Sequence, residues 1–215
     1  MDPETTFFEG LIELQYGKKV VNLLKPIAQK ISWAKGWPED DTAFWNAEAF
    51  MWERKIDREK RNLIFKELRF LIGGKNLDLG CGGYSYIPST GFDFSSEMLK
   101  QNEQCTSKVQ GDLEKKLPFR VKEFDSITAV FVLNYVRNYN GLLQEVSRVL
   151  KPKGIFVMVL YSGELNDWQK QKEVNRFSVK KWKSILKEVG FKVNFYEKGK
   201  MWFFKCGKAY LRPAL

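Results

Sequence analysis

The stretch Lys75–Gly83, with the sequence KNLDLGCGG, constrains the fold of this chain more than any other. It begins as a short apolar strand that carries the acidic residue Asp78, and it runs at once into a turn that contains Gly80 and Gly82. Glycines let the backbone bend sharply and let a ligand approach it with no Cβ in the way. The stretch therefore predicts a strand and a turn that cradle a nucleotide.

Two kinds of nucleotide ligand use such a turn. A nicotinamide cofactor requires the pattern G-x-G-x-x-G, but Ser85 stands where the third glycine is needed. The carboxylate of Asp78 would repel a pyrophosphate, whereas it suits a ligand that carries an ammonium and a sulfonium group. The D-x-G-x-G core resembles the first motif of the class I S-adenosylmethionine (SAM) methyltransferases. This resemblance implies SAM as the cofactor, bound by Asp78, Gly80, Cys81 and Gly82.

From Lys75 onward, short β-rich segments alternate with amphipathic ones, which predicts an α/β fold with an open, largely parallel sheet. Strands are expected over residues 76–79, 91–94, 108–110, 124–131 and 155–160, and helices over residues 95–105, 139–150 and 178–190. A turn at Lys198-Gly199 joins two further strands, 191–196 and 201–206, in an antiparallel hairpin. A sheet that ends in such a hairpin is the Rossmann-like arrangement of the methyltransferases, whereas a nicotinamide-type sheet would continue in parallel.

The first 73 residues show apolar side chains at helical spacing and no period-two alternation. Helices are expected within residues 5–34, 43–53 and 56–72. Pro26 should kink or divide the first of these stretches. We therefore expect one structural unit with a helical N-terminal cover (1–73) and a SAM-binding domain (74–215). Four aromatic residues of the cover are expected either to line an acceptor pocket or to pack the cover onto the sheet: Trp37, Phe44, Trp45 and Trp52.

A second segment of the chain, G-x-D-x-S-x-x-M over residues 91–98, is close to the second signature of the same family. The resemblance implies that Asp93 accepts hydrogen bonds from both ribose hydroxyls and that Phe94 lies against the adenine. It also matches Asp112 to the acidic residue that bonds the adenine amino group, and it gives Leu113 backbone contacts to the same ring.

Further segments follow in the order that the family shows. Residues 118–119 and 124–127 resemble its L-P-F and F-D elements, and residues 150–154 resemble its L-x-P-G-G turn with Lys153 in place of the first glycine. The positions that lie beside the methionine part of SAM are Ala129, Val130 and Phe131. The likeness covers roughly residues 44–206. It is strongest to the small methyltransferases of the ubiquinone and menaquinone pathways and to the tRNA wobble-uridine enzymes.

One segment departs from the family. Only eight residues separate Gly82 from Gly91, and Pro88 is among them, so the usual long first helix should shrink to about one turn. Asp93 comes thirteen residues after Gly80, whereas nicotinamide folds expect roughly 20. The shortened segment should open the methionine end of the cofactor to nearby tyrosines and to the N-terminal helices.

The chain has no histidine, which removes the commonest general base and the commonest metal ligand. The catalytic candidates are Tyr84, Tyr135 and Tyr161, and the acidic alternatives are Asp40, Asp41 and Glu164. Asn134-Tyr135 follows the fourth strand, where enzymes that methylate amino groups in nucleic acids carry an Asn/Asp-Pro-Pro-Tyr/Phe run, and this argues against that chemistry. The odd, widely spaced cysteines predict no zinc site and no disulfide framework, so we expect no metal and a reducing cytoplasm.

The bulk composition leaves several partners open. A formal charge of +10 and a pI of about 9.4 permit contact with RNA. No apolar run approaches the ~20 residues that a membrane span needs. We expect a SAM-dependent methyltransferase that acts on a small or medium-sized acceptor. The alternatives are an RNA-modifying or tRNA-modifying methyltransferase and a SAM-binding interaction protein without turnover. No pattern sets the oligomeric state.

Overall fold

A seven-stranded sheet forms the centre of the part of the chain that the structure, a computed structural model, describes: residues 2–51, 56–164, 170 and 172–208. The strand order is β3-β2-β1-β4-β5-β7-β6. All neighbours pair in parallel except β5 with β7 and β7 with β6, which confirms the predicted sheet and its C-terminal hairpin. The strands are β1 (Asn76–Leu79), β2 (Ser89–Asp93), β3 (Cys105–Gln110), β4 (Phe124–Val130), β5 (Leu150–Tyr161), β6 (Phe191–Lys198) and β7 (Met201–Lys208).

The order in which strands are added to the sheet reverses next to β1. From β1 the chain builds β2 and β3 on one side, then crosses over to build β4 and β5 on the other. The carboxyl ends of β1 and β4 therefore diverge into connections that lie on opposite sides of the sheet. In open α/β sheets, such a switch point leaves a crevice where ligands bind.

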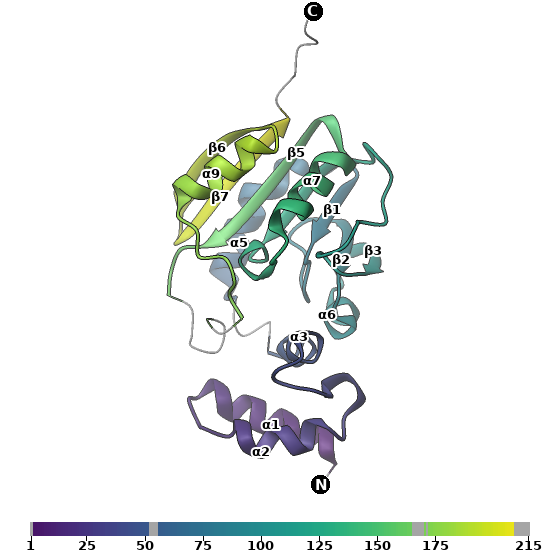
Figure 1. Cartoon of the computed structure of the whole chain (residues 1–215), viewed down its shortest axis with the longest axis vertical. Coiled ribbons are helices and arrows are strands. Elements are labelled where there is room, and N and C mark those ends of the chain that lie inside the picture. Colours follow the sequence, from purple (N-terminus) through teal and green to yellow (C-terminus); the bar gives the residue numbers. More distant parts are fainter. Residues whose placement is uncertain (1, 52–55, 165–169, 171, 209–215) are drawn as a thin grey trace, which may run out of the picture.

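Helices cover both faces of the sheet (Figure 1). They are α5 (Arg58–Leu68) on one face, α7 (Tyr139–Val149) and α9 (Val179–Glu188) on the other, and the short α6 (Ser96–Gln101) after β2. Side chains alternate along β5, because successive residues of a strand point to opposite faces. Phe156 and Met158 pack with α7 and α9, whereas Val157 and Val159 pack with α5. Among the described residues, no helix has both the length and the apolar character that crossing a membrane requires.

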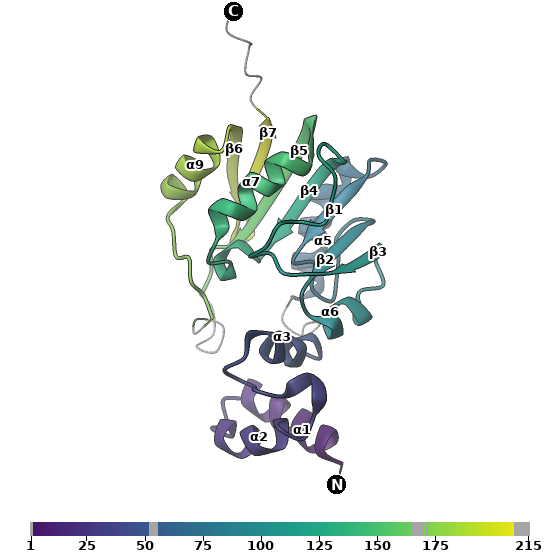
Figure 2. The ribbon, with the colours of Figure 1, turned by 45° about the vertical axis from the view of Figure 1, so that its right-hand side comes forward.

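The N-terminal helices form a core of their own. The elements are α1 (Pro3–Gln15), α2 (Val21–Ala28), the 3₁₀ turn η1 (Ser32–Ala34) and α3 (Asp41–Ala49). Phe7, Trp37 and Phe44 fill this core and are at most 1% exposed. The pair α1–α2 lies at one end of the molecule, and α3 stands between this pair and the sheet (Figure 2). Helix α5 and the 3₁₀ turn η2 (Arg69–Leu71) pack with the sheet instead. A unit boundary at residue 73 stays a prediction.

Some element boundaries differ from those expected. The helices within residues 5–34 divide at Gly17, whose φ of +80° breaks the helix, and not at Pro26, which lies inside α2 two residues before its end. The expected turn over residues 151–154 is part of β5, because a register shift opposite Phe124 and Ser126 absorbs the extra residues. Residue 53, the expected end of the second helical stretch, lies outside the described residues, as does Trp52.

Candidate active site

The glycine turn follows β1 directly. Gly80 and Gly82 have φ values of +58° and +56°, a backbone conformation that residues with a side chain rarely adopt. The N–H of Gly80 donates to Phe92 O at 2.8 Å, so the turn is bonded to β2. A Cβ on Gly80 would lie 2.3 Å from Val132 Cγ2, at the end of β4. Only glycine fits this position without moving Val132.

Asp93 ends β2 with its side chain in the crevice. Its Oδ2 accepts from Gly82 N and its Oδ1 from Ser95 N, both at 2.9 Å. Burial raises the pKa of Asp93, while these backbone N–H groups act in the opposite direction. Since each carboxylate oxygen has a second lone pair, Asp93 can accept two further hydrogen bonds from a ligand diol.

A cavity of about 280 Å³ lies between α3, which contributes Asp41, Thr42 and Trp45, and the carboxyl ends of the strands. Eight of the eleven residues predicted to bind the cofactor line it: Gly80, Gly82, Asp93, Phe94, Asp112, Leu113, Val130 and Phe131. They come from the turns after β1 and β3 and from the ends of β2 and β4. Residues far apart in the sequence thus meet because parallel strands end at one edge of the sheet.

Asp78 does not line this cavity. It points to the α5 face of the sheet, where β1 pairs with β4 and Asp78 stands opposite Thr128. Its Oδ1 accepts from Thr128 Oγ1 and its Oδ2 from Ser85 Oγ, both at 2.7 Å. Burial raises the pKa of Asp78 to about 6. In this structure, Asp78 therefore links the segment that follows the glycine turn to β4, through Ser85 and Thr128.

The two other cofactor candidates also lie outside the cavity lining. Ala129 is fully buried in the core on the α7 face. Cys81 is 5% exposed and points beneath the turn, toward Cys105. Direct contact of these residues with a cofactor stays a prediction.

The buried side-chain amide of Asn102 holds the segment between β1 and β2 by hydrogen bonds. Residues 80–88 contain turns and bends but no helix, so even the one expected turn of helix is absent. Asn102, which is fully buried after α6, takes over the hydrogen bonds. Its Nδ2 donates to Gly82 O at 3.0 Å and to Cys81 O at 3.4 Å, and its Oδ1 accepts from Ser85 N at 3.2 Å. Asn102 thus fixes both sides of the turn.

Aromatic side chains form the wall opposite the glycine turn. Trp45 of α3 meets Tyr135 edge to face, with ring centroids 4.9 Å apart, and both line the cavity. Phe131 has a φ of +58°, a strained backbone of the kind that clusters at functional sites. Of the three tyrosines predicted as catalytic candidates, only Tyr135 is in the lining, whereas Tyr84 and Tyr161 are not.

The state of Tyr135 follows from its surroundings. Burial, together with the nearby carboxylates Glu173 and Glu48, raises the pKa of its phenol. The phenol is therefore protonated at neutral pH and can donate a hydrogen bond, but it is a poor base there.

Charged residues fasten α3 to the rim of the cavity. Asp41, near the start of α3, accepts from Lys172 Nζ at 2.6 Å and pairs with Arg137 at 3.4 Å. Partial burial opposes ionisation, but the two cations lower the pKa of Asp41 below its usual value. Lys172 also lies over the Phe44 ring at 4.9 Å. No sequence pattern pointed to Arg137 or Lys172, nor to Glu114, whose carboxylate accepts from Arg137 N at 2.7 Å.

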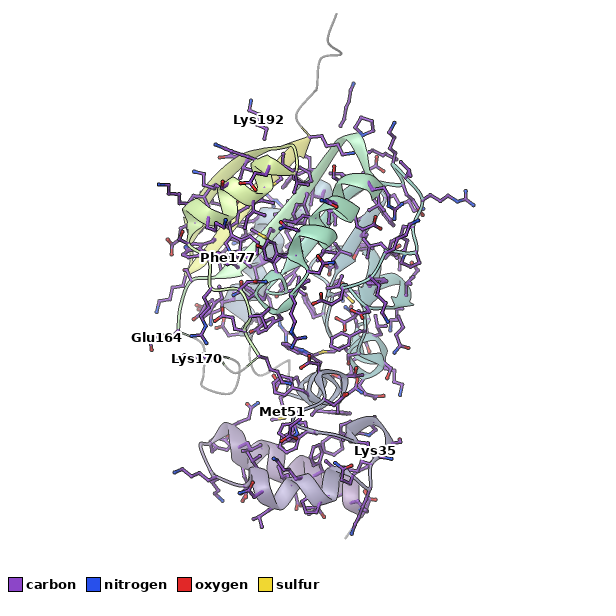
Figure 3. All side chains as sticks on the ribbon, viewed as in Figure 1. Lys35, Met51, Glu164, Lys170, Phe177 and Lys192 are labelled. Carbon is purple, nitrogen blue, oxygen red and sulfur yellow. The ribbon has the colours of Figure 1, made fainter. Side chains whose placement is uncertain are left out.

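The remaining candidates have other roles. Asp40 caps α3 by accepting from Ala43 N at 2.8 Å. Glu164 is exposed and points outward at the edge of the molecule (Figure 3). Among the aromatic residues of the cover, Trp37 and Phe44 fill its core, whereas Trp45 reaches the cavity. Within the described part of the chain, no three His, Cys, Asp or Glu residues are placed to hold a metal ion.

The site fits a nucleoside cofactor that carries a further chain along the glycine turn. The backbone at Gly80 and Gly82 is open to close approach, the carboxylate of Asp93 has lone pairs that can accept from a diol, and Phe94 and Leu113 offer apolar surface. Asp112 lines the same end, although its Oδ1 also accepts from Glu114 N at 2.9 Å. Together, the strand order and this crevice define a Rossmann-like nucleotide-binding protein whose sheet ends in an antiparallel hairpin.

Comparison with known proteins narrows this class. Residues 77–158 match the model of the methyltransferase domain. A demethylmenaquinone methyltransferase of Staphylococcus saprophyticus is 35% identical over 114 residues, which is 45% of this chain and 48% of that protein. An uncharacterized protein of Methanocaldococcus jannaschii is 30% identical over 138 residues, 58% of this chain and 67% of that one. The chain belongs to the class I SAM-dependent methyltransferase family, whose cofactor is SAM.

The solved structures agree on the fold. A chain of the solved complex between the Haloferax volcanii Trm112 methyltransferase activator and its methyltransferase superposes with a TM-score of 0.64 at 17% identity, over 77% of this chain and 98% of that one. At this identity the likeness concerns the fold alone. The chain spans about half the length of the demethylmenaquinone methyltransferases that it matches.

Proposed function

We propose that this chain transfers a methyl group from SAM to a small-molecule acceptor that enters between α3 and the carboxyl ends of β1 and β4. The observation that carries the proposal is the meeting of the glycine turn, Asp93 and the Trp45–Tyr135 wall in one cavity. Asp93 holds the ribose diol, and Gly80 and Gly82 allow the methionine part to approach the backbone. When bound, SAM supplies an electrophilic methyl group that is transferred by in-line displacement, so positioning and exclusion of water are the main tasks of the protein.

The acceptor side favours a nucleophile that needs no strong base. The phenol of Tyr135 stays protonated, and the carboxylate of Asp41 is engaged by Lys172. An acceptor atom that already carries a free electron pair at neutral pH fits this lining, with Tyr135 as a hydrogen-bond donor that orients it. The aromatic walls suit a planar acceptor. Quinone-like compounds come first in a screen, because relatives of this chain are named for demethylmenaquinone.

Calorimetric titration with SAM, S-adenosylhomocysteine and NAD tests the cofactor assignment. We expect micromolar binding of both SAM ligands, no binding of NAD, and a loss of affinity in Asp93→Ala. Titration of Lys66→Ala, an exposed residue of α5, controls for the substitution itself. Absence of SAM and S-adenosylhomocysteine binding in the folded protein would refute the proposal. Binding without turnover of any acceptor in the screen would favour an interaction protein instead.

A second candidate, methylation of RNA, is favoured by the placement of charge. Residues 170–208 contain twelve of the lysines and arginines but only three acidic residues, so this segment holds most of the net charge of +10. On α9, the exposed residues of this set include Lys180, Lys181 and Lys187. Neutralising phosphates with such residues gives a binding constant that falls steeply with salt.

Binding of a labelled tRNA mixture across a salt series tests this candidate. The triple variant Lys180→Glu, Lys181→Glu, Lys187→Glu is compared with a control of equal charge change on the exposed surface of the cover, Lys19→Glu, Lys30→Glu, Lys35→Glu. Lys35 and the basic hairpin residue Lys192 lie at opposite ends of the molecule (Figure 3). We expect the α9 variant to lose affinity and salt slope and the control to keep both. Equal losses in the two variants would contradict RNA binding at this face.

The cellular location of the protein is also a proposal. We place the protein in the cytoplasm, because the thiols of Cys81, Cys105 and Cys206 are all free.

A further inference from the structure

Two thiols face each other beneath the glycine turn. A Cβ built on Gly91 would lie 2.3 Å from Cys105 Sγ and 2.9 Å from Cys81 Sγ, so only the lack of a side chain on the middle strand lets the sulfurs meet. Both sulfurs lie within 2.9 Å of this one position, so they are close neighbours. One thiol comes from the turn after β1, and the other comes from the first residue of β3, two strands away.

The pair differs in access and in acidity. Cys105 is partly exposed at the edge of the sheet, whereas Cys81 is 5% exposed. The hydrogen bond from Cys81 lowers the pKa of Cys105, and Ser85 Oγ contacts the same sulfur at 3.3 Å. Of the charged groups that face Cys105, Lys108 favours the thiolate and Asp78 opposes it. The accessible thiol of Cys105 is thus the better nucleophile toward an oxidant. The buried thiol of Cys81 is placed to attack Cys105 after Cys105 has been oxidised.

We propose that Cys81 and Cys105 form a reversible disulfide beneath the glycine turn, a modification site that links oxidation by hydroperoxides to cofactor binding. The Cys105 thiolate attacks a peroxide oxygen, the O–O bond breaks, and the hydroxide released takes up a proton to give water. The Cys81 thiol then attacks the resulting sulfenic acid, forming the S–S bond and releasing a second water. The cysteines lose two electrons and the peroxide gains them. A dithiol reverses the reaction by exchange.

The link to the cofactor comes from the position of Cys81 between Gly80 and Gly82. A disulfide holds its sulfurs about 2.05 Å apart, closer than any thiol contact, so Cys81 must move toward β3. The backbone of this residue is bonded on both sides, since its N–H donates to Phe92 O at 3.3 Å and its carbonyl accepts from Asn102. Oxidation therefore displaces the turn that lines the cavity and weakens binding. This consequence rests on the proposed function, whereas the disulfide itself does not.

Peptide mapping after oxidation tests the bond directly. The full chain is treated with stoichiometric hydrogen peroxide, alkylated and digested with trypsin. The Lys and Arg positions separate Cys81 in peptide 76–100, Cys105 in peptide 101–108 and Cys206 in peptide 206–208. We expect the first two peptides to be joined and peptide 206–208 to be alkylated. Absence of the joined peptide, or its pairing with Cys206 instead, would overturn the proposal.

Calorimetry with S-adenosylhomocysteine tests the consequence. We expect the dissociation constant of the oxidised chain to rise at least tenfold and to return after treatment with dithiothreitol. In Cys105→Ser, peroxide should leave the constant unchanged, and Cys206→Ser should respond as the unaltered chain does. A joined peptide with unchanged affinity would refute the coupling. If neither redox form binds S-adenosylhomocysteine, the proposed function fails, and the peptide map still decides the modification site.

Discussion

Replacing Asn102 by alanine should separate the stability of the fold from the order of the glycine turn. The side chain is fully buried and joins Gly82, Cys81 and Ser85 through its amide. Alanine leaves the carbonyl of Gly82 and the N–H of Ser85, which both belong to buried residues, without this partner. The turn then has the glycines that allow it to bend, but it lacks the contact that selects one conformation.

Asn102 also bonds Cys81 O at 3.4 Å and Gln104 N, which belongs to an exposed residue. The magnitude is worked from the other two backbone groups, Gly82 O and Ser85 N. A buried polar group without a partner costs roughly 1–3 kcal/mol, so we expect the free energy of unfolding to fall by about 2–4 kcal/mol. Binding must then restore the order of the turn. If about half of that free energy is drawn from the cofactor, affinity for S-adenosylhomocysteine falls by about 5-fold to 30-fold, because each 1.4 kcal/mol is a factor of ten.

Chemical denaturation and calorimetry on one preparation measure both quantities. Asn76→Ala provides the matched control, because Asn76 is also a buried amide and donates to Pro88 O at 3.0 Å, but at the opposite end of β1 from the cavity. We expect similar losses of stability in the two variants and a loss of affinity in Asn102→Ala alone. A folded Asn102→Ala that binds S-adenosylhomocysteine within twofold of the unaltered chain would show that the turn is held by other contacts.

Three further predictions concern single positions. Gly80→Ala should lose more stability than Gly190→Ala in denaturant titrations. Both glycines have a positive φ, which costs an alanine roughly 1–2 kcal/mol, but only a Cβ on Gly80 would also meet Val132. Equal losses would contradict the steric argument. Burial raises the pKa of Asp78 from its ordinary value of 3.8 to about 6 in the folded protein, so the stability that it contributes is present below pH 3.8 and lost as pH rises through 6. Asp78→Asn should remove this slope from melting curves recorded between pH 4 and 7, and an unchanged slope would place the proton elsewhere. Glu67 has the opposite sign, since hydrogen bonds with Tyr196 and nearby lysines lower its pKa from 4.5 to about 2; its stabilisation is lost as pH falls through that range, and Glu67→Gln should flatten the acid limb of the melting curve.

The sequence predicted those parts of the site that local patterns encode. The glycine turn follows β1 because Gly80 and Gly82 adopt the positive φ values that end the strand, and Asp93 ends β2 as its motif indicates. Asp78 shows where such reasoning stops. Its position at the end of β1 was evident, but its partner was set by the pairing of β1 with β4, which brings Thr128 beside it. A short motif does not contain that information.

The rim of the cavity could not have been read from the sequence. Lys172 and Arg137 meet Asp41 across 131 and 96 residues of chain, and no spacing rule connects them. The missing helix between β1 and β2 has a similar cause. The sequence shows that the segment between β1 and β2 is short. It does not show that Asn102 supplies the hydrogen bonds that hold this segment, because no motif marks this asparagine.

The separation of the two cores has an evolutionary consequence. The buried side chains that hold α1, α2 and α3 together are a different set from those that hold the sheet. Helix α3 reaches the rest of the molecule through individual contacts, such as the hydrogen bond from Ser95 to Asn46 at 2.7 Å and the ring contact of Trp45 with Tyr135. Mutations that reshape the helical end therefore leave the cradle of the glycine turn intact. Selection can change which molecule is accepted while the donor stays the same, and the N-terminal helices are where such divergence among relatives should concentrate.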